Sequence, residues 1–183
     1  IDYQGIYRDP SAVKYWTAFV PRLAMAEEQC AAFFRDYPDG CLLSVVRNPM
    51  SWFVSAHRHK PEEYTLEKAA ELWLESTRAA MRNLSNYPDR VVLVHFDGLV
   101  KDTEAPMRAI SRRLGLEFHA SLLVPTFNGM PMSANTSFNA SPAGTILKAS
   151  VDRGQQLESS EASFLKERTG ACYREALAHV VNT

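Results

Sequence analysis

Arg47 and Ser55 are the two side chains whose types and spacing point most directly to chemistry. Arg47 follows the apolar run Cys41–Val46, which predicts a strand buried on both faces, and Pro49 predicts a non-helical turn after it. Ser55 lies one turn into the amphipathic stretch that begins near Ser51. A guanidinium offers two parallel donors, a hydroxyl adds a third, and a helix N-terminus is a positive end. The pattern predicts a phosphate-binding corner; the alternative is an arginine paired with a local carboxylate beside a serine without a role.

Two further segments have residue types suited to a nucleotide. In Asn135–Phe138, polar groups stand beside an aromatic ring that could stack on a planar base while the hydroxyls donate hydrogen bonds. The alternative for this segment is a turn with one buried phenylalanine. Arg153 is followed by Gly154, and a glycine lets the backbone approach an anion closely. The alternative there is a solvated charge on a loop.

The elements that position these residues alternate between helices and buried strands. Helices are expected at Ser11–Tyr37, with an interruption at Pro21, and at Thr65–Asn86. Two further helices are expected, one from Asp102 or Thr103 to Leu114 with Gly115 closing it, and one at Phe164–Val181 with a break near Gly170. A second buried strand is expected at Val91–Val94, and a loop at Pro125–Gly144. This alternation predicts an α/β fold with a parallel sheet flanked by helices. Two strands alone bury the edges and faces of a sheet poorly, so we expect further strands upstream, outside this chain.

Composition limits the broad class of protein. The chain has 183 residues, of which 46% are hydrophobic and 22% charged, which suits one globular domain over residues 1–183. Twenty basic side chains against 21 acidic ones give a net charge of -1, which argues against a generally basic nucleic-acid binder. No apolar run approaches the roughly 20 residues that span a bilayer, so neither nucleic acid nor membrane is an expected partner.

Cysteine and histidine usage predicts neither a disulfide framework nor a metal site. Cys30, Cys41 and Cys172 are few and scattered, so we expect a reducing, cytoplasmic setting. The five histidines share no ligand pattern with nearby carboxylates, so no metal is expected. The sequence opens at Ile1 without a methionine or a signal peptide, and we expect a chain that is N-terminally shortened or incompletely represented.

Four segments together resemble the PAPS-dependent sulfotransferase family. They are, in chain order, Leu42–Ser55, Val91–Asp102 with Ile110–Leu116, Thr136–Phe138, and Arg153–Gly154. The first looks like the family's apolar strand, Arg-Asn/Asp-Pro and serine eight residues after the arginine. The others look like its next strand and Leu-Gly-Leu helix end, its Thr-Ser-Phe loop and its Arg-Lys-Gly segment.

The resemblance implies a P-loop-like α/β fold and a transferase. Such an enzyme moves a sulfuryl group from PAPS to an acceptor hydroxyl or amine and leaves PAP. By the same resemblance, the 3′-phosphate would be held by Arg47, Ser55, Arg153 and the Gly154 amide. The adenine would be bordered by Phe96, Thr136 and Phe138. The acceptor would be a small molecule or a glycan, and the sequence does not indicate which acceptor or what oligomeric state.

The sequence departs from the family in three ways. None of the eight glycines is followed by lysine, as a phosphosulfate-binding loop would require. No histidine precedes Arg47, where the cytosolic branch places its catalytic histidine, and the Arg-Lys-Gly lysine is absent. His57 and His59 could face an acceptor, but exposed helix histidines are commoner than catalytic ones, so no catalytic residue is assigned. These departures predict a sulfotransferase domain that lacks its first strand and phosphosulfate loop.

Two other functions are alternatives. A nucleotide-kinase-like phosphotransferase would share the sheet but would leave the Thr-Ser-Phe and Arg-Gly segments unexplained. A catalytically inactive PAP- or nucleotide-binding module is favoured if the chain is complete. An upstream strand followed by a phosphosulfate loop would favour the enzyme over this module.

Overall fold

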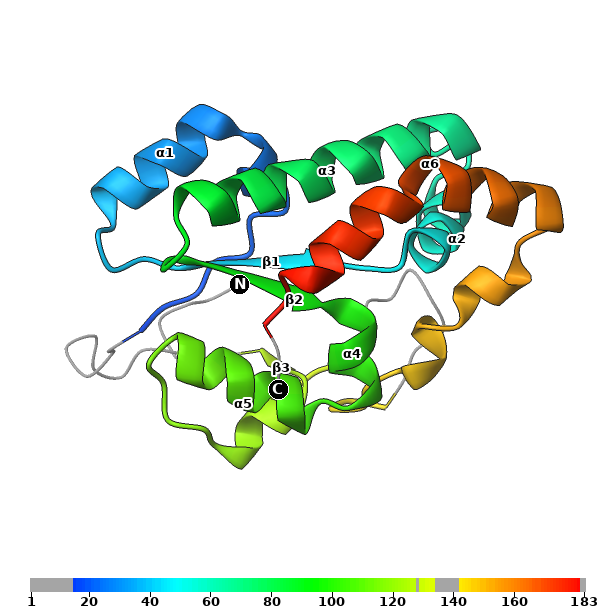
Figure 1. Ribbon diagram of the computed structural model, residues 1–183. Helices are drawn as coiled ribbons and strands as arrows, with labels where there is room; N and C mark the ends of the chain where they lie inside the picture. Colours follow the sequence, from blue (N-terminus) through cyan, green and yellow to red (C-terminus); the bar gives the residue numbers. More distant parts are fainter. Residues whose placement is uncertain (1–14, 128, 134–141, 182–183) are drawn as a thin grey trace.

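Two parallel strands form the centre of the structure, a computed structural model that describes residues 15–127, 129–133 and 142–181. β1 (Leu42–Val46) pairs residue by residue with β2 (Val91–His95). Helices lie above and below this pair of strands (Figure 1). The arrangement confirms the predicted α/β class with a parallel sheet flanked by helices.

The upper helical layer consists of α3 (Leu66–Asn86) and α6 (Ser159–Ala178) (Figure 1). With the strands below them, these helices enclose a buried cluster made of Val46, Trp73, Leu74, Ala80, Leu93, Cys172 and Ala176. α3 agrees closely with the helix that its apolar period predicts. α6 runs unbroken through Gly170, so the predicted break is wrong. A glycine inside a helix costs only about 1 kcal/mol relative to alanine, and burial of Leu165 and Cys172 on the same helix offsets that cost.

The lower layer consists of α4 (Phe96–Lys101) and α5 (Glu104–Arg113). Val92 and Val94 of β2 pack with Ile110 of α5 in a second buried cluster. The helix predicted from Asp102 or Thr103 to Leu114 is confirmed as α5 to within two residues, and Gly115 follows it with φ of 66°. α4 was not predicted, because a helix of six residues is too short to produce an apolar period.

The two strands differ in how far they are buried. All four valine and leucine side chains of β2 are buried, as predicted. In β1, Ser44 and Val46 are buried beneath the upper helices, but Leu43 is 46% and Val45 is 58% exposed on the opposite face. The prediction that β1 is buried on both faces is therefore wrong. Among the described residues, β1 pairs with no strand other than β2.

α1 (Glu27–Asp36) completes the upper layer and is preceded by a short 3-10 turn at Leu23–Met25. Only this part of the predicted helix Ser11–Tyr37 is confirmed, since residues 15–20 are not helical. Arg90, which precedes β2, donates hydrogen bonds to the carbonyl oxygens of Phe34, Tyr37 and Gly40. One guanidinium thus holds the end of α1 to the sheet.

The predicted loop Pro125–Gly144 contains a small hairpin in its described part. β3 (Thr126–Phe127) pairs in antiparallel fashion with β4 (Met130–Pro131). Further 3-10 turns at Ala120–Leu123, Lys148–Ser150 and η6 (Arg153–Gln156) lead from the lower layer to α6.

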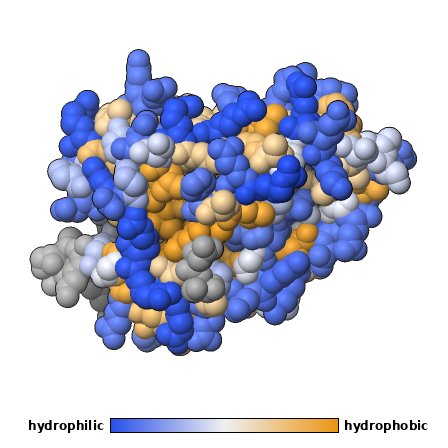
Figure 2. Space-filling view, in the orientation of Figure 1, coloured by the Kyte–Doolittle hydropathy of each residue, from blue (hydrophilic) through white to orange (hydrophobic). Residues whose placement is uncertain are grey.

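Apolar residues gather in the middle of the face seen in Figure 2, where the strands lie between the two helical layers. None of the described helices combines the length and the apolar character that crossing a bilayer would require. Within the same residues, no three His, Cys, Asp or Glu side chains are grouped so that they could hold a metal ion.

Candidate functional site

The junction between β1 and α2 (Pro49–His59) places Arg47 at the carboxyl end of the sheet. Asn48 is the N-cap of α2, and its Oδ1 accepts hydrogen bonds from the backbone N–H groups of Met50 (3.0 Å) and Ser51 (3.3 Å). Pro49 occupies the first helical position, where its missing N–H costs nothing. Asn48 itself is non-helical, which is the conformation that a following proline favours. This junction fixes where Arg47 leaves the strand.

The structure brings Arg47 and Ser55 together. Arg47 Nη1 donates to Ser55 Oγ over 3.1 Å, and Ser55 Oγ donates in turn to the carbonyl oxygen of Ser51, at 3.0 Å. Arg47 Nη2 donates to the carbonyl oxygen of Ser150. The spacing of eight residues therefore reaches across the strand-to-helix junction, as the sequence pattern predicts.

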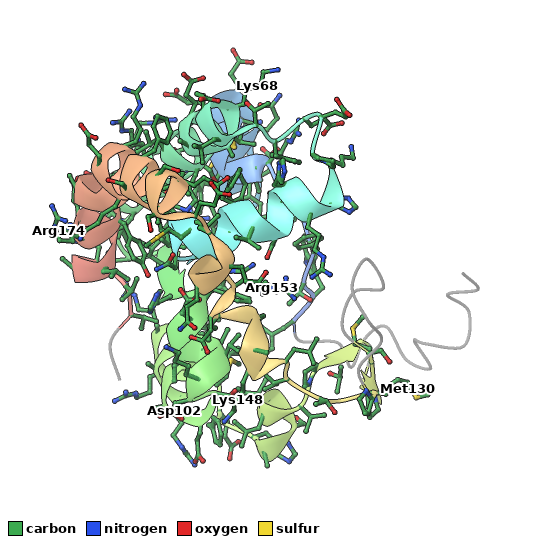
Figure 3. All side chains as sticks on the ribbon, turned by 90° about the vertical axis from the view of Figure 1, so that its right-hand side faces the viewer. Lys68, Asp102, Met130, Lys148, Arg153 and Arg174 are labelled. Carbon is green, nitrogen blue, oxygen red and sulfur yellow. The ribbon has the colours of Figure 1, made fainter. Side chains whose placement is uncertain are left out.

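Arg153 and Gly154 reach the same place from a distant part of the chain. Arg153 Nη1 donates to Ser55 Oγ over 2.8 Å, so this single oxygen accepts from two guanidinium groups. The Gly154 backbone N–H donates to Ser51 Oγ over 3.1 Å. Figure 3 shows Arg153 on the segment that runs beneath α2. Three of the predicted residues and the Gly154 backbone thus converge on one face of α2.

The guanidinium groups of this cluster repel each other. Burial lowers the pKa of Arg47, the charge of Asp97 acts against this, and the charge of Arg153 lowers it further. Burial and the charge of Arg58 likewise lower the pKa of Arg153. Arg58, one turn beyond Ser55 on α2, is thus a third cation near the site. The sequence analysis missed it, although its spacing of three from Ser55 places it on the same side of the helix.

Phe96 supports Arg47 from below. The guanidinium carbon of Arg47 stands 4.7 Å from the centre of the Phe96 ring, in a cation–π contact. The resemblance placed this ring beside adenine, whereas its contact in the structure is with Arg47. Thr136 and Phe138 lie outside the described residues.

The two histidines of α2 lie toward its C-terminal end and are exposed. His57 stacks on Phe53 with 5.3 Å between ring centres, and its Nδ1 lies 2.9 Å from the carbonyl oxygen of Tyr64. These contacts of His57 are local to α2 and the loop that follows it, and neither histidine is assigned a catalytic role.

A polar cluster that the sequence analysis missed lies next to Arg47. Asp97 Oδ2 accepts from the Asn48 backbone N–H at 3.0 Å and lies 3.3 Å from His95 Nε2, which is 2.9 Å from the Tyr173 hydroxyl oxygen. Burial and the charge of Asp97 raise the pKa of Tyr173 to about 12. Among the described residues, buried Asp97 Oδ1 and Arg47 Nε have no hydrogen-bond partner. Four separate elements supply these groups, so sequence spacing gives no sign of the cluster.

The Asp97 carboxylate should make the stability of the fold sensitive to acid. Burial acts to raise its pKa, but hydrogen bonds from His95 and Asn48 and the charges of His95 and Arg47 prevail, so the pKa lies below its ordinary value. A carboxyl whose pKa is lowered on folding stabilises the fold above its unfolded pKa of about 4, and this stabilisation disappears as pH falls through the folded pKa. We expect Asp97→Asn to unfold more easily than the parent at pH 7, with the difference shrinking toward pH 3. Urea denaturation at both pH values tests this, and a difference that stays constant would contradict it.

A sequence model described as the sulfotransferase family matches residues 6–120. The chain belongs to the sulfotransferase family. The matched part includes the strand, Arg47 and Ser55, whereas Arg153 and Gly154 lie beyond it. This membership confirms the resemblance inferred from the sequence and favours a sulfotransferase over the nucleotide-kinase alternative.

A solved structure supports the same fold. The chain is similar to the sulfotransferase domain from the curacin biosynthetic pathway, with a TM-score of 0.59 and 20% sequence identity. The similarity covers 82% of this chain but only 60% of that domain. No curated protein sequence matches the chain. At this identity the similarity concerns the fold of a sulfotransferase and not the donor or acceptor.

Proposed function

We propose that the chain binds PAPS, and the PAP that remains after transfer, through the 3′-phosphate of the nucleotide. The reaction it would serve is transfer of a sulfuryl group to an acceptor hydroxyl or amine on a small molecule or a glycan. The observation that carries the proposal is the pair of guanidinium groups that donate to Ser55 Oγ, at 3.1 Å from Arg47 and 2.8 Å from Arg153. Membership of the sulfotransferase family supports this nucleotide as the ligand.

The charges around Ser55 suit a phosphate better than a carboxylate of the protein. The charge of Arg153 lowers the pKa of Arg47, and the charge of Arg58 lowers the pKa of Arg153. Asp97 is the acidic side chain that acts on Arg47, and its Oδ2 already accepts from Asn48 and faces His95. A phosphate with two negative charges would offset the repulsion between the arginines and accept several charge-assisted hydrogen bonds at once.

The transfer step needs groups beyond these residues. In that step the acceptor oxygen or nitrogen forms a bond to sulfur while the bridging bond from sulfur to the phosphate oxygen breaks, a base takes the acceptor proton, and PAP leaves. None of the glycines in the sequence is followed by lysine, and none of the described residues is assigned as the base. The proposal therefore assigns the 3′-phosphate site to this chain and leaves the catalytic residue unassigned.

Comparing PAP with AMP tests the proposed site, because the two nucleotides share the 5′-phosphate and differ in the 3′-phosphate. We expect PAP to bind at least tenfold more tightly than AMP and to raise the unfolding temperature more, since a charged hydrogen bond contributes about 1.5–3 kcal/mol. Calorimetry and thermal unfolding measure both. Adenosine 2′,5′-bisphosphate, with the same number of phosphates, is the control for plain charge attraction. Equal binding of all three nucleotides would refute the proposal.

A PAP-binding module without catalysis is a second candidate, because the groups brought together at Ser55 would hold the 3′-phosphate and not the sulfuryl group. Such a module contacts the 3′-phosphate and not the sulfuryl group, so it should bind PAPS and PAP with equal affinity. An active site that stabilises the bridging oxygen should distinguish the two.

A further inference from the structure

Ser51 is a buried hydroxyl whose two long-range hydrogen bonds go to the same distant segment. Its side chain is in the first turn of α2, and the residue is 2% exposed. Ser51 Oγ donates to the carbonyl oxygen of Val151 over 2.6 Å and accepts from the backbone N–H of Gly154 over 3.1 Å. One hydroxyl therefore satisfies both an acceptor and a donor of a chain segment one hundred residues away.

The segment Ser150–Gly154 lies directly on α2 at this point. A Cβ atom added to Gly154 would stand 2.9 Å from Met50 Cβ and 3.2 Å from the Ser51 backbone nitrogen, which leaves no room for any side chain but hydrogen. Val151, in the same segment, is buried, with 8% of its surface exposed. The hydrogen bond from Arg47 to the Ser150 carbonyl adds a further attachment.

The position of Arg153 depends on this attachment of the segment to α2. It lies between Val151 and Gly154, the two residues that Ser51 holds, and its Nη1 reaches Ser55 Oγ one turn further along α2. Among the described residues, the hydrogen bonds of Ser51 Oγ go to this segment, so its effect on a phosphate would be indirect. The Ser51 carbonyl, which accepts from Ser55, is backbone and survives any substitution of the side chain.

We propose that Ser51 is a positioning residue: its hydroxyl fastens the segment Ser150–Gly154 to α2 and so holds Arg153 at the 3′-phosphate site. This inference rests on the proposed function. It implies that contacts within the chain itself, from Ser51 to Val151 and Gly154, set the position of Arg153 beside Ser55. It also explains why a glycine follows Arg153, since closeness to α2 is required there.

A double-mutant cycle with Arg153 tests whether Ser51 acts through it. Ser51→Ala should weaken PAP binding about tenfold, which corresponds to the loss of one charge-assisted contact. It should weaken AMP binding by less than about twofold. Arg153→Ala should weaken PAP binding at least as much. The double variant should bind PAP no more weakly than Arg153→Ala alone, because the two changes remove the same contact. Additive losses would overturn the inference.

Two further variants keep the test independent of folding. Gly154→Ala leaves the Ser51 hydroxyl in place but pushes the segment off α2, so it should lower the preference for PAP over AMP in the same way. Ser76→Ala, at an exposed serine inside α3, is the matched control and should leave both affinities unchanged. Gly154→Ala and Ser51→Ala proteins that keep the parent's preference for PAP would overturn the positioning role.

The preference of the parent chain for PAP over AMP distinguishes a failure of the proposed function from a failure of the role of Ser51. If it shows no preference for PAP over AMP, the proposed function fails. If the parent and Ser51→Ala share the same preference while Arg153→Ala loses it, the 3′-phosphate site stands and the role of Ser51 is refuted.

Discussion

Replacing Arg47 by alanine should weaken PAP binding by about 30- to 150-fold, the equivalent of about 2–3 kcal/mol for a lost charged partner. Arg47 stands at the end of β1, donates to Ser55 Oγ at 3.1 Å and is held over the Phe96 ring. Its removal takes away a guanidinium that donates to Ser55 on α2 and contacts the Phe96 ring on α4. Calorimetric titration with PAP measures the loss, and titration with AMP shows how much of it belongs to the 3′-phosphate.

Two control variants separate charge from geometry. Arg47→Lys keeps the positive charge but loses the planar pair of donors, so it should recover only part of the affinity. Arg35→Ala removes an exposed arginine that pairs with its neighbour Asp36, and it should bind PAP like the parent. An Arg47→Ala protein that is folded and binds PAP with unchanged affinity would defeat the assignment of the site.

Trp73→Ala should lower the free energy of unfolding by about 3–5 kcal/mol, the range for emptying a buried aromatic site. Trp73 is 4% exposed on α3 and belongs to the cluster between the upper helices and the strands. Its Nε1–H also donates to the carbonyl oxygen of Arg47 over 3.0 Å. The indole therefore links the core to the residue that leads into the phosphate site. Urea denaturation followed by circular dichroism measures the change.

The matched control uses another tryptophan of the same chain. Trp16 is 59% exposed and meets the edge of Tyr37, so Trp16→Ala should cost less than about 1 kcal/mol. Trp73→Phe keeps an aromatic ring in the core but loses the hydrogen bond to Arg47, and its cost should lie between those of the two alanine variants. If Trp73→Ala and Trp16→Ala cost the same, Trp73 is not the core residue described here.

The parts of the fold that were predictable are those with a strong local pattern. β2, α3 and α5 were located to within two residues because each has a continuous apolar run or a long apolar period. The meeting of Arg47 with Ser55 was predictable for a related reason. A strand end, a proline and eight residues of separation leave the two side chains few other arrangements.

The rest depends on contacts between distant segments. The exposed face of β1 could not be read from its apolar run, because exposure is decided by what the helices cover. Asp97 and Ser51 gain their importance from partners on other elements, and no spacing within the sequence indicates those partners. Gly170 was misjudged because tertiary packing supplies what the helix loses at a glycine.

The closeness of Arg47, Arg153 and Arg58 affects the choice of buffer for binding and unfolding experiments on this chain. Folding brings like charges together, so any polyvalent anion that enters their midst acts as a counterion and raises the melting temperature. Sulfate and phosphate buffers would thus imitate and compete with a nucleotide. In chloride buffers of low ionic strength, no polyvalent anion competes with the nucleotide that is titrated.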